Sequence, residues 1–470
     1  FNNQYYRAKS LRSGQVGYRN RAAYSKNEEL KMNNLSRKLM SNRGFAFIAV
    51  YLVISVLVIF AAVFVNQSIS QNNTANIFKR QARALNTADA GLDHAFMWLR
   101  AQAESGLFPT GTSINPWNGG APQSLGNASY SVVIARIVIA GSPTLFRYSV
   151  TSTGTADNMT RVLRKYVQAV NFSNYIWYTN RETYGGSNVW FIKNDFLNGP
   201  MHTNAHFNIY GKDPGAVFTG EATCVDGYVR YYNNGNNINL PQATGTSWDA
   251  PDFQGGLTFG VEQSTMPGTA LNLKTNAASG GSSFNKNTQI LLNNDGTMNY
   301  KVGNGSWQNN QALPANGALF VNGNLTISGT LNGRLTVGAS GNVVIPGNLV
   351  YASGDPVANP NSDDTLGIIS EGDVVISNNA PNDLEIDGCI MALNSSFYRD
   401  NYGSGLKGTL KIRGGIIQKE RGPVGTFNVA AGIKVSGYTK DYSYDGRLLN
   451  SPPPFMPTTG DCITLAWEEI

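Results

Sequence analysis

The sequence predicts an α+β protein: one long N-terminal helix that crosses a membrane and continues as a stem, a small β-sheet beside the stem, and then mostly β domains that include a β-solenoid. Three observations predict this fold class. An uncharged apolar segment runs directly into an amphipathic one, alternating strand patterns follow, and short glycine-bounded apolar segments recur in the last third of the chain.

Composition places the chain among β-rich extracellular proteins. Of its 470 residues, 41% are hydrophobic, which excludes wholesale disorder, and only 14% are charged. The 51 glycines suit a surface with many tight turns. The formal charge of +6 combines ten basic and two acidic residues in positions 1–44, a net +8, with −2 for the rest. A near-neutral body does not support a nucleic-acid groove, so no nucleic-acid partner is expected.

The first helix is predicted to span a bilayer. Between Phe45 and Val65 lie 21 residues without a charge, and about 20 are needed. The basic flank orients the N-terminus towards the cytoplasm and everything after Val65 outwards. A buried core helix and a cleaved secretory signal are the alternatives. The segment is long for either, and no Ala-x-Ala site follows it.

The helix is predicted to continue as a stem to about residue 108. From Asn66 onwards there is no proline and one interior glycine, Gly91, until Gly106 and Pro109 end the pattern. Apolar residues recur at helical spacing on one face. A helix of some sixty residues would be roughly 90 Å long.

The start of the helix resembles a type IV prepilin processing site. A basic leader, 1–44, ends in Gly44, and Phe45 heads the apolar helix. The resemblance implies that a prepilin peptidase cuts between them. A start at Met32 would leave a short leader of the usual prepilin form, so the natural N-terminus stays open.

The stem carries a second resemblance, to the signature of PilX-type minor pilins. Its candidate residues are Ala88, Asp89, Ala90, Gly91 and Leu92. The resemblance covers the N-terminal third. It implies that small residues let the helix pack closely on a head domain, and that the partners are other pilin subunits and the cytoplasmic membrane.

The fifth residue after the cut is Ala49, where major pilins carry Glu. In them that carboxylate meets the N-terminal amine of a neighbouring subunit, and burying it unpaired would be costly. A subunit at a filament tip has no such neighbour. The absence favours a tip subunit, and a membrane anchor that never polymerises is the alternative.

A pilin-like β head is expected at 109–170. Alternating patterns predict strands at 129–139, 145–154 and 160–170, with a Gly-Ser-Pro turn at 141–143. Together they would form a small antiparallel sheet on the C-terminal half of the stem helix.

A second β domain is expected at 171–315, and it begins with seven aromatic residues within 21 positions. Such a cluster forms either a core, which is the favoured interpretation, or a platform for a surface carbohydrate or protein ligand. His202 and His206 would share a metal on a helix. In a strand they would lie about 13 Å apart, so His202 is expected to be structural, and no metal or cofactor is expected.

Repeats predict a β-solenoid at 316–440. GNLTI at 323–327 recurs as GNVVI at 341–345 and GDVVI at 372–376, with LEIDG at 384–388 and LKIRG at 410–414 as further coils. An antiparallel sandwich of short strands is the alternative. The proline-rich tail, 441–470, is expected to be extended and to lie across this last domain.

No catalytic residue is assigned, and the chain is not expected to be an enzyme. Asp373, Glu385 and Asp387 lie on different predicted coils, but no spacing selects an acid and a base. The segment 441–446 resembles a calcium loop, yet Pro452 stands where its Glu is needed. Cys224, Cys389 and Cys462 show no metal or redox spacing, and their disulfide pairing stays open.

These observations predict a PilX-like minor pilin subunit, anchored in the membrane and then incorporated in a type IV pilus at the cell surface, at its tip. Its work would be pilus assembly and surface adhesion. The alternative is a membrane-tethered extracellular β-helix protein that binds or cleaves polysaccharide. A scaffold that polymerises through solenoid ends is a third hypothesis.

Overall fold

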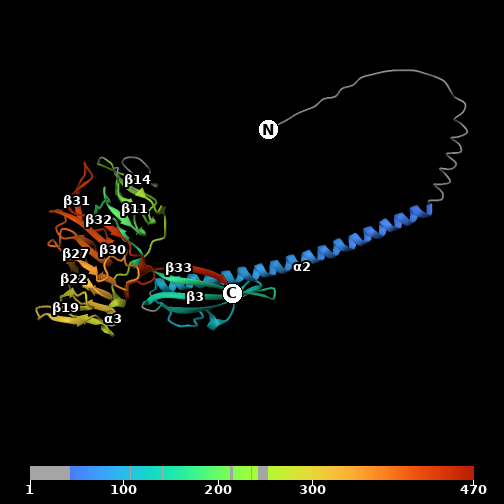
Figure 1. The fold of residues 1–470 in the computed structure, drawn as a ribbon, viewed down its shortest axis with the longest axis horizontal. Coiled ribbons are helices and arrows are strands. Elements are labelled where there is room, and N and C mark those ends of the chain that lie inside the picture. The colour runs from blue at the N-terminus through green and yellow to red at the C-terminus, as the bar shows by residue number, and fades with distance from the viewer. Residues whose placement is uncertain (1–42, 106, 140–141, 212–214, 234, 242–251) are drawn as a thin grey trace, which may run out of the picture. The chain divides into compact units, whose positions relative to one another are not determined.

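A computed structural model describes residues 43–105, 107–139, 142–211, 215–233, 235–241 and 252–470. Most of the basic leader, including Met32, lies outside these residues. The chain divides into two units, Phe1–Arg80 and Gln81–Ile470, and the 62-residue helix α2 (Arg43–Glu104) contributes to both (Figure 1). A single long helix with an apolar N-terminal part, followed by a large β-rich region, confirms the predicted fold class.

The second unit contains an antiparallel five-stranded sheet that packs on residues 81–104 of α2. The three strands predicted for the head are its central members, and each is longer than predicted by up to three residues at an end. The sheet order is β1 (Gln123–Leu125), β2 (Ala128–Ile139), β3 (Ser142–Ala156), β4 (Met159–Asn171) and β33 (Thr458–Glu469), with the short helix η1 (Asn118–Gly120) before it.

The last strand of this sheet comes from the C-terminus, which corrects part of the prediction for the tail. The proline-rich segment 451–457 does lie on the preceding domain, where Arg334 Nη2 donates to Pro452 O at 2.6 Å. Residues 458–469 do not lie across the preceding domain; they pair with β4, with Thr458 opposite Asn171 and Glu469 opposite Leu163. The physical reason is the free edge of β4, which β33, with three Thr, Ile463 and Trp467, can complete.

The remaining β structure is dominated by a 23-stranded sheet, here named the coil stack. Its members are β5 (Trp177–Arg181), β8 (Phe196–Asn198), β9 (Met201–Thr203), β11 (Val217–Phe218), β12 (Ala222–Cys224), β15 (Asp252–Phe253), β16 (Leu257–Phe259), β17 (Ser282–Phe284), β18 (Thr288–Leu292), β19 (Thr297–Val302), β20 (Gln308–Ala312), β21 (Ala318–Val321), β22 (Leu325–Leu331), β23 (Arg334–Ala339), β24 (Val343–Ile345), β25 (Leu349–Tyr351), β26 (Thr365–Ser370), β27 (Val374–Ile376), β28 (Leu384–Ala392), β29 (Phe397–Arg399), β30 (Leu406–Glu420), β31 (Gly425–Asn428) and β32 (Ile433–Ser443).

Smaller elements surround the coil stack. They are the hairpin β6 (Thr183–Tyr184) and β7 (Ser187–Asn188), the sheet of β10 (Asn208–Tyr210), β13 (Val229–Asn233) and β14 (Asn236–Leu240), the helix α3 (Leu271–Ala278), and the single turns η2 (Phe172–Asn174) and η3 (Gly446–Leu449).

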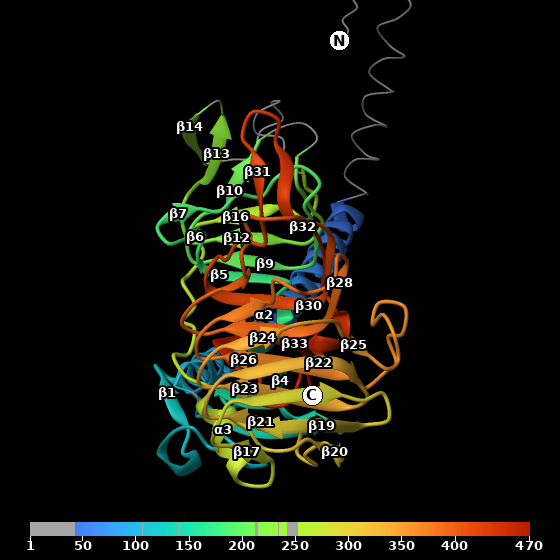
Figure 2. The same ribbon diagram turned by 90° about the vertical axis from the view of Figure 1, so that its left-hand side faces the viewer.

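Most strands in the coil stack pair in parallel, and the antiparallel pairs are β18 with β19, β19 with β20 and β31 with β32. One ladder runs β16-β12-β9-β5-β30-β28-β26-β23-β21-β17, and Figure 2 shows it with β16 and β17 at opposite ends. The repeated segments are neighbours in these ladders: Leu325 lies opposite Val343, and Val343 opposite Val374. Such pairing differs from that of an antiparallel sandwich. The inward Ile, Leu and Val side chains form one continuous core.

The order of coils in space differs from their order in the chain. Residues 177–259 build one end of the coil stack and residues 282–443 build the other, and they meet where β5 pairs with β30 and β8 with β32. The boundary expected between 315 and 316 therefore falls inside a single sheet, because β17 pairs with β21 and β18 with β22 across it.

Candidate functional site

The predicted stem signature lies where α2 packs on the five-stranded sheet. Ala88, Leu92 and Ala95 are fully buried there, together with Ala84 and Leu99. Of the other signature residues, Asp89 is exposed, Ala90 is half-buried and Gly91 is buried. Ala88 and Leu92 of the signature therefore belong to one apolar face of the helix, which the sheet covers.

Two glycines allow the helix and the sheet to approach closely. A Cβ on Gly154 of β3 would overlap the backbone of Ala84 and Ala88. A Cβ on Gly91 would lie 2.8 Å from the ring of Tyr130. Real Cβ atoms do not make such contacts, so any larger residue at either position would push the helix away from the sheet.

The predicted membrane and processing residues belong to the first unit. Gly44 and Phe45 lie in the first turn of α2, and the side chains of Phe45, Ala49 and Val65 are exposed. By length and composition the helix can cross a membrane, and its apolar window is not covered by protein. Peptidase cleavage and orientation stay predictions.

The aromatic segment at 171–191 divides between the two interpretations. Phe172, Trp177, Tyr178 and Phe191 are at most 2% exposed and belong to apolar cores. Three others, Tyr175, Tyr184 and Trp190, are only half-buried. The core interpretation holds for the first group, and the second remains available to a ligand.

His202 is a structural histidine, as predicted. It lies on strand β9, is 5% exposed and stacks on Tyr178, with ring centroids 4.9 Å apart. Its Nδ1 lies 2.9 Å from Thr223 Oγ1 and its Nε2 2.9 Å from Asn204 Oδ1. Burial lowers its pKa. In the described part of the chain, no three His, Cys, Asp or Glu side chains gather as a metal site.

The calcium-like segment and the cysteines have other roles. Asp441 pairs with Arg413, and Asp445 caps η3 and pairs with Arg447, so neither carboxylate is free for calcium. Cys224, Cys389 and Cys462 are all unpaired thiols. Burial raises the pKa of Cys224 and Cys462 to about 12, which leaves both thiols unreactive at neutral pH.

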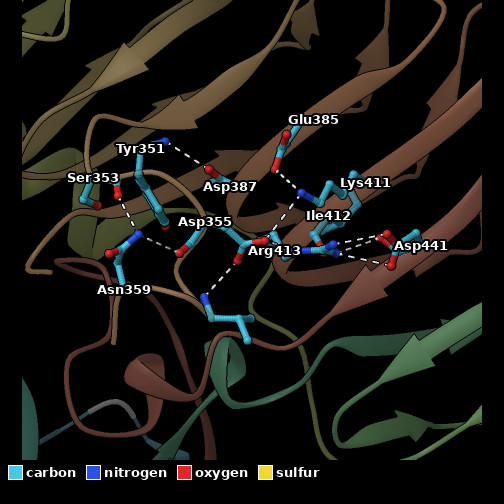
Figure 3. Close-up of polar contacts among 11 residues, drawn as sticks. Tyr351, Ser353, Asp355, Asn359, Glu385, Asp387, Lys411, Ile412, Arg413 and Asp441 are labelled. Atoms are coloured by element: carbon cyan, nitrogen blue, oxygen red, sulfur yellow. Dashed lines mark hydrogen bonds and ion pairs between the residues drawn. The ribbon is translucent and has the colours of Figure 1, made fainter. Parts of the chain in front are cut away.

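The structure gathers charged residues that the sequence had left scattered. This charged cluster consists of Asp355, Glu385, Asp387, Lys411, Arg413 and Asp441, on the outer face of β28, β30 and β32 and the loop 352–364 (Figure 3).

Most charges in the cluster neutralise one another. Lys411 Nζ lies 2.9 Å from Glu385 Oε1 and 3.4 Å from Asp355 Oδ2. Arg413 Nη2 lies 3.1 Å from Asp441 Oδ2, and its Nε lies 3.4 Å from the same Asp355 oxygen. Asp355 thus connects the loop to both cations, and its pKa is lowered although burial alone would raise it.

Asp387 is the exception. Its side chain is 1% exposed, and only one of its oxygens has a protein partner, the Tyr351 backbone N–H at 3.0 Å. Burial, and then the nearby carboxylates of Glu385 and Asp355, raise its pKa to about 7. The group is therefore partly protonated at neutral pH.

Asp387 has the raised pKa of a catalytic general acid, but a substrate cannot reach it. A general acid must reach the leaving oxygen of its substrate within hydrogen-bond distance. Asp387 is buried, while the more accessible carboxylates of Glu385 and Asp441 are already paired with Lys411 and Arg413. The geometry favours a cluster that holds the loop on the coil stack.

Sequence reasoning noticed Glu385 and Asp387 but missed Lys411 and Arg413. The signal was present in the repeats LEIDG and LKIRG. Stacked in register, they place Glu385 opposite Lys411 and Asp387 opposite Arg413. Asp355, from an irregular loop, carried no such signal. Asp373 lies elsewhere, and its carboxylate accepts a hydrogen bond from Ser396 N.

The fold defines a class of protein: a membrane-length N-terminal helix continued into a β-rich body. No protein-family model matches the sequence, and no curated protein matches it. Among solved structures, the chain is similar to the crystal structure of the competence-associated pilin ComZ from Thermus thermophilus, with 12% identity over 83% of this chain and 97% of that chain. The TM-score is 0.32, too low for this likeness to carry an argument about function.

Proposed function

We propose that this chain is a type IV pilin-like subunit of the PilX minor pilin type. One observation carries the proposal: a helix whose apolar N-terminal part has no protein cover, and whose small-residue face at 84–103 is buried under an antiparallel sheet. Such a helix serves first as a single membrane anchor and then as packing surface against the helices of other pilin subunits.

Maturation follows from the processing site. A prepilin peptidase cuts between Gly44 and Phe45 on the cytoplasmic side of the membrane, where the basic residues of the leader hold that end. Mass spectrometry of the membrane-extracted protein tests this step. An N-terminus at Phe45 is expected with active peptidase. An uncut chain in the same cells would contradict the proposal.

Location at the filament tip follows from Ala49, which lacks the carboxylate that a shaft subunit needs. The coil stack, a β-solenoid in this proposal, is then displayed outside the cell for assembly and adhesion. Immunogold labelling of purified pili with an antibody to residues 282–443 tests the location. Gold at one end is expected. Label along the shaft, or only in the membrane fraction, would exclude a tip subunit.

A polysaccharide-binding or polysaccharide-cleaving β-helix protein is the second candidate, and the charged cluster is the observation that favours it. We propose the non-enzymatic role because Asp387 is covered and its neighbours are paired. The full chain in detergent is incubated with pectin, alginate and cell-wall glycans. No new reducing ends are expected. New ends that the variant Asp387→Asn fails to release would establish an enzyme instead.

A further inference from the structure

A cavity of about 220 Å³ opens on the coil stack beside the β6–β7 hairpin and the β31–β32 hairpin. Aromatic rings from separate parts of the chain line it: Tyr184, Trp190, Tyr402 and Phe427. Gly422 and Gly425 contribute backbone to the same lining. The cavity therefore combines ring faces with accessible backbone, as small-ligand sites commonly do.

Neighbouring rings hold these aromatic side chains in place. Tyr184 packs against Tyr402 and Tyr398, with ring centroids 6.0 and 5.6 Å away. Trp190 packs edge-on against Tyr232 at 5.5 Å. Because the rings are already ordered, a ligand that stacks on them loses little of its binding free energy to immobilising side chains.

Polar edges of these rings are free. Within the described residues, neither the hydroxyls of Tyr184 and Tyr402 nor the indole N–H of Trp190 makes a hydrogen bond. All three side chains are half-buried, and none of these polar atoms is enclosed by protein, so a ligand can reach them. An aromatic face with an unused donor at its edge matches a pyranose, which has an apolar face and equatorial hydroxyls.

A lysine supplies the charge preference. Lys434 Nζ donates to the carbonyls of Lys407, at 2.5 Å, and Gly408, at 3.2 Å. No carboxylate of the described chain lies within ion-pair distance of it, whereas the cavity's other lysine, Lys440, is paired with Asp195 at 2.5 Å. Burial lowers the pKa of Lys434, and Asp383 counteracts this from a distance. A cation without a counter-ion favours an anionic ligand.

We propose that this cavity binds a pyranose carrying a carboxylate, as the terminal or internal residue of a surface polysaccharide. The ring stacks on Trp190 and Tyr184, and the carboxylate is bound by Lys434. The site gives the adhesion part of the proposed function its ligand class. Binding is a property of the coil stack, so its failure would leave the membrane and filament roles standing.

The test is calorimetric titration of the full chain in detergent with three probes. Trigalacturonate and sialyllactose carry the carboxylate on two different sugars, and maltotriose carries none. We expect one or both acidic probes to bind and maltotriose to bind at least tenfold more weakly. Lys434→Gln should weaken acidic binding about tenfold, equivalent to about 1.4 kcal/mol. Trp190→Ala should remove it.

Matched controls lie at the far end of the coil stack. Lys286→Gln and Trp307→Ala change an exposed lysine and an exposed tryptophan outside the cavity, and both should leave binding unchanged. The proposal is overturned if neither acidic probe binds. It is equally overturned if maltotriose binds as well as they do, or if Lys434→Gln binds the acidic probes like the parent.

Discussion

A single buried carboxyl links the stability of this protein to pH. Asp387 has one hydrogen-bonded oxygen and one without a partner, in a site that burial and two nearby carboxylates make unfavourable for charge. Its neighbour Asp355 has the opposite behaviour, because the Val357 N–H, Arg413 and Lys411 outweigh burial and lower its pKa. Two carboxyls of one cluster thus respond oppositely to pH, and environment alone sets the difference.

The sign for Asp387 follows from linkage. Its pKa is about 7 in the folded protein and near 3.8 when unfolded, so the folded state binds this proton more tightly. The resulting contribution to the free energy of unfolding is fully present below about pH 4 and is lost as pH rises through 7. Asp387→Asn cannot ionise. In urea titrations, the free energy of unfolding of the variant relative to that of the parent should increase by a few kcal/mol as pH rises from 4 to 8.

Asp355→Asn is the matched control for this prediction. Because the pKa of Asp355 is lowered on folding, its contribution is present at neutral pH and is lost as pH falls through the folded value. This variant should therefore be less stable than the parent at pH 7 and converge with it in acid. If both variants followed the parent at every pH, the charged cluster would have no role in stability.

At the scale of elements, buried ion pairs mark the join between the two segments of the coil stack. Glu182 follows β5 and Arg421 follows β30, and their side chains, each 1% exposed, lie 2.8 Å apart. The guanidinium also lies 3.6 Å from the centroid of the Phe191 ring. A second pair, Lys440 with Asp195, crosses the same join. Both pairs connect residues about 240 positions apart, so they favour one register for the meeting coils.

Arg421→Met should destabilise the protein by about 3–5 kcal/mol, because it leaves Glu182 buried without its counter-charge. Glu182 also accepts hydrogen bonds from Trp177 Nε1 and Thr179 Oγ1, so Gln keeps its acceptor. The double variant Arg421→Met with Glu182→Gln should recover most of the loss. Chemical denaturation of parent, single and double variants checks this. A double variant no more stable than the single one would contradict a role for the buried charge.

The close contact between α2 and the five-stranded sheet depends on glycine, whereas the ion pairs across it, Arg83–Asp157 and Lys165–Asp93, are partly exposed. Gly154→Val would force its side chain into the backbone of α2 at Ala84 and Ala88, and we expect a loss of at least 2–3 kcal/mol. Gly227→Val is the control, because a Cβ at Gly227 meets nothing within 4 Å. Gly126→Val would be a poorer control, because the positive φ of Gly126 would strain a valine. Thermal unfolding followed by circular dichroism should separate the two. Equal loss from both would argue against close packing.

Elements whose residue pattern lies within one continuous segment could be predicted from the sequence, and elements that depend on contacts between distant segments could not. The helix and strands β2 to β4 follow from uninterrupted periodic patterns, and Gly388 lies opposite Gly414 because the repeats carry their own register. The coils at 177–259 escaped prediction, since their strands have two to five residues joined by irregular loops. Arg421 and Glu182 meet only through the join, and nothing near either residue indicates the other.

On the scale of the second unit, the coil stack is an insertion between two paired strands. The chain leaves the five-stranded sheet at the end of β4, builds the coils and returns through η3 to β33, where Thr458 lies opposite Asn171. Hydrogen bonds close this junction: Asn171 Nδ2 donates to Met456 O, and Gln168 Nε2 donates to Leu449 O. Strand β33 thus completes the sheet, and the paired strands β4 and β33 hold the two ends of the inserted coil stack.

Deleting residues 458–470 should therefore separate the unfolding of the sheet from that of the coil stack. The sheet loses an edge strand and several backbone hydrogen bonds, each contributing about 1 kcal/mol, while the coil core contains no residue of β33. Scanning calorimetry in detergent should show the parent's unfolding divide into two transitions. The earlier one should be lower by about 5 °C or more. A shorter deletion, 468–470, removes only the end of the strand and should change little. If the long deletion left the melting profile unaltered, β33 would not contribute to stability, and the coupling of the coil stack to the helix would have to reside in β4 alone.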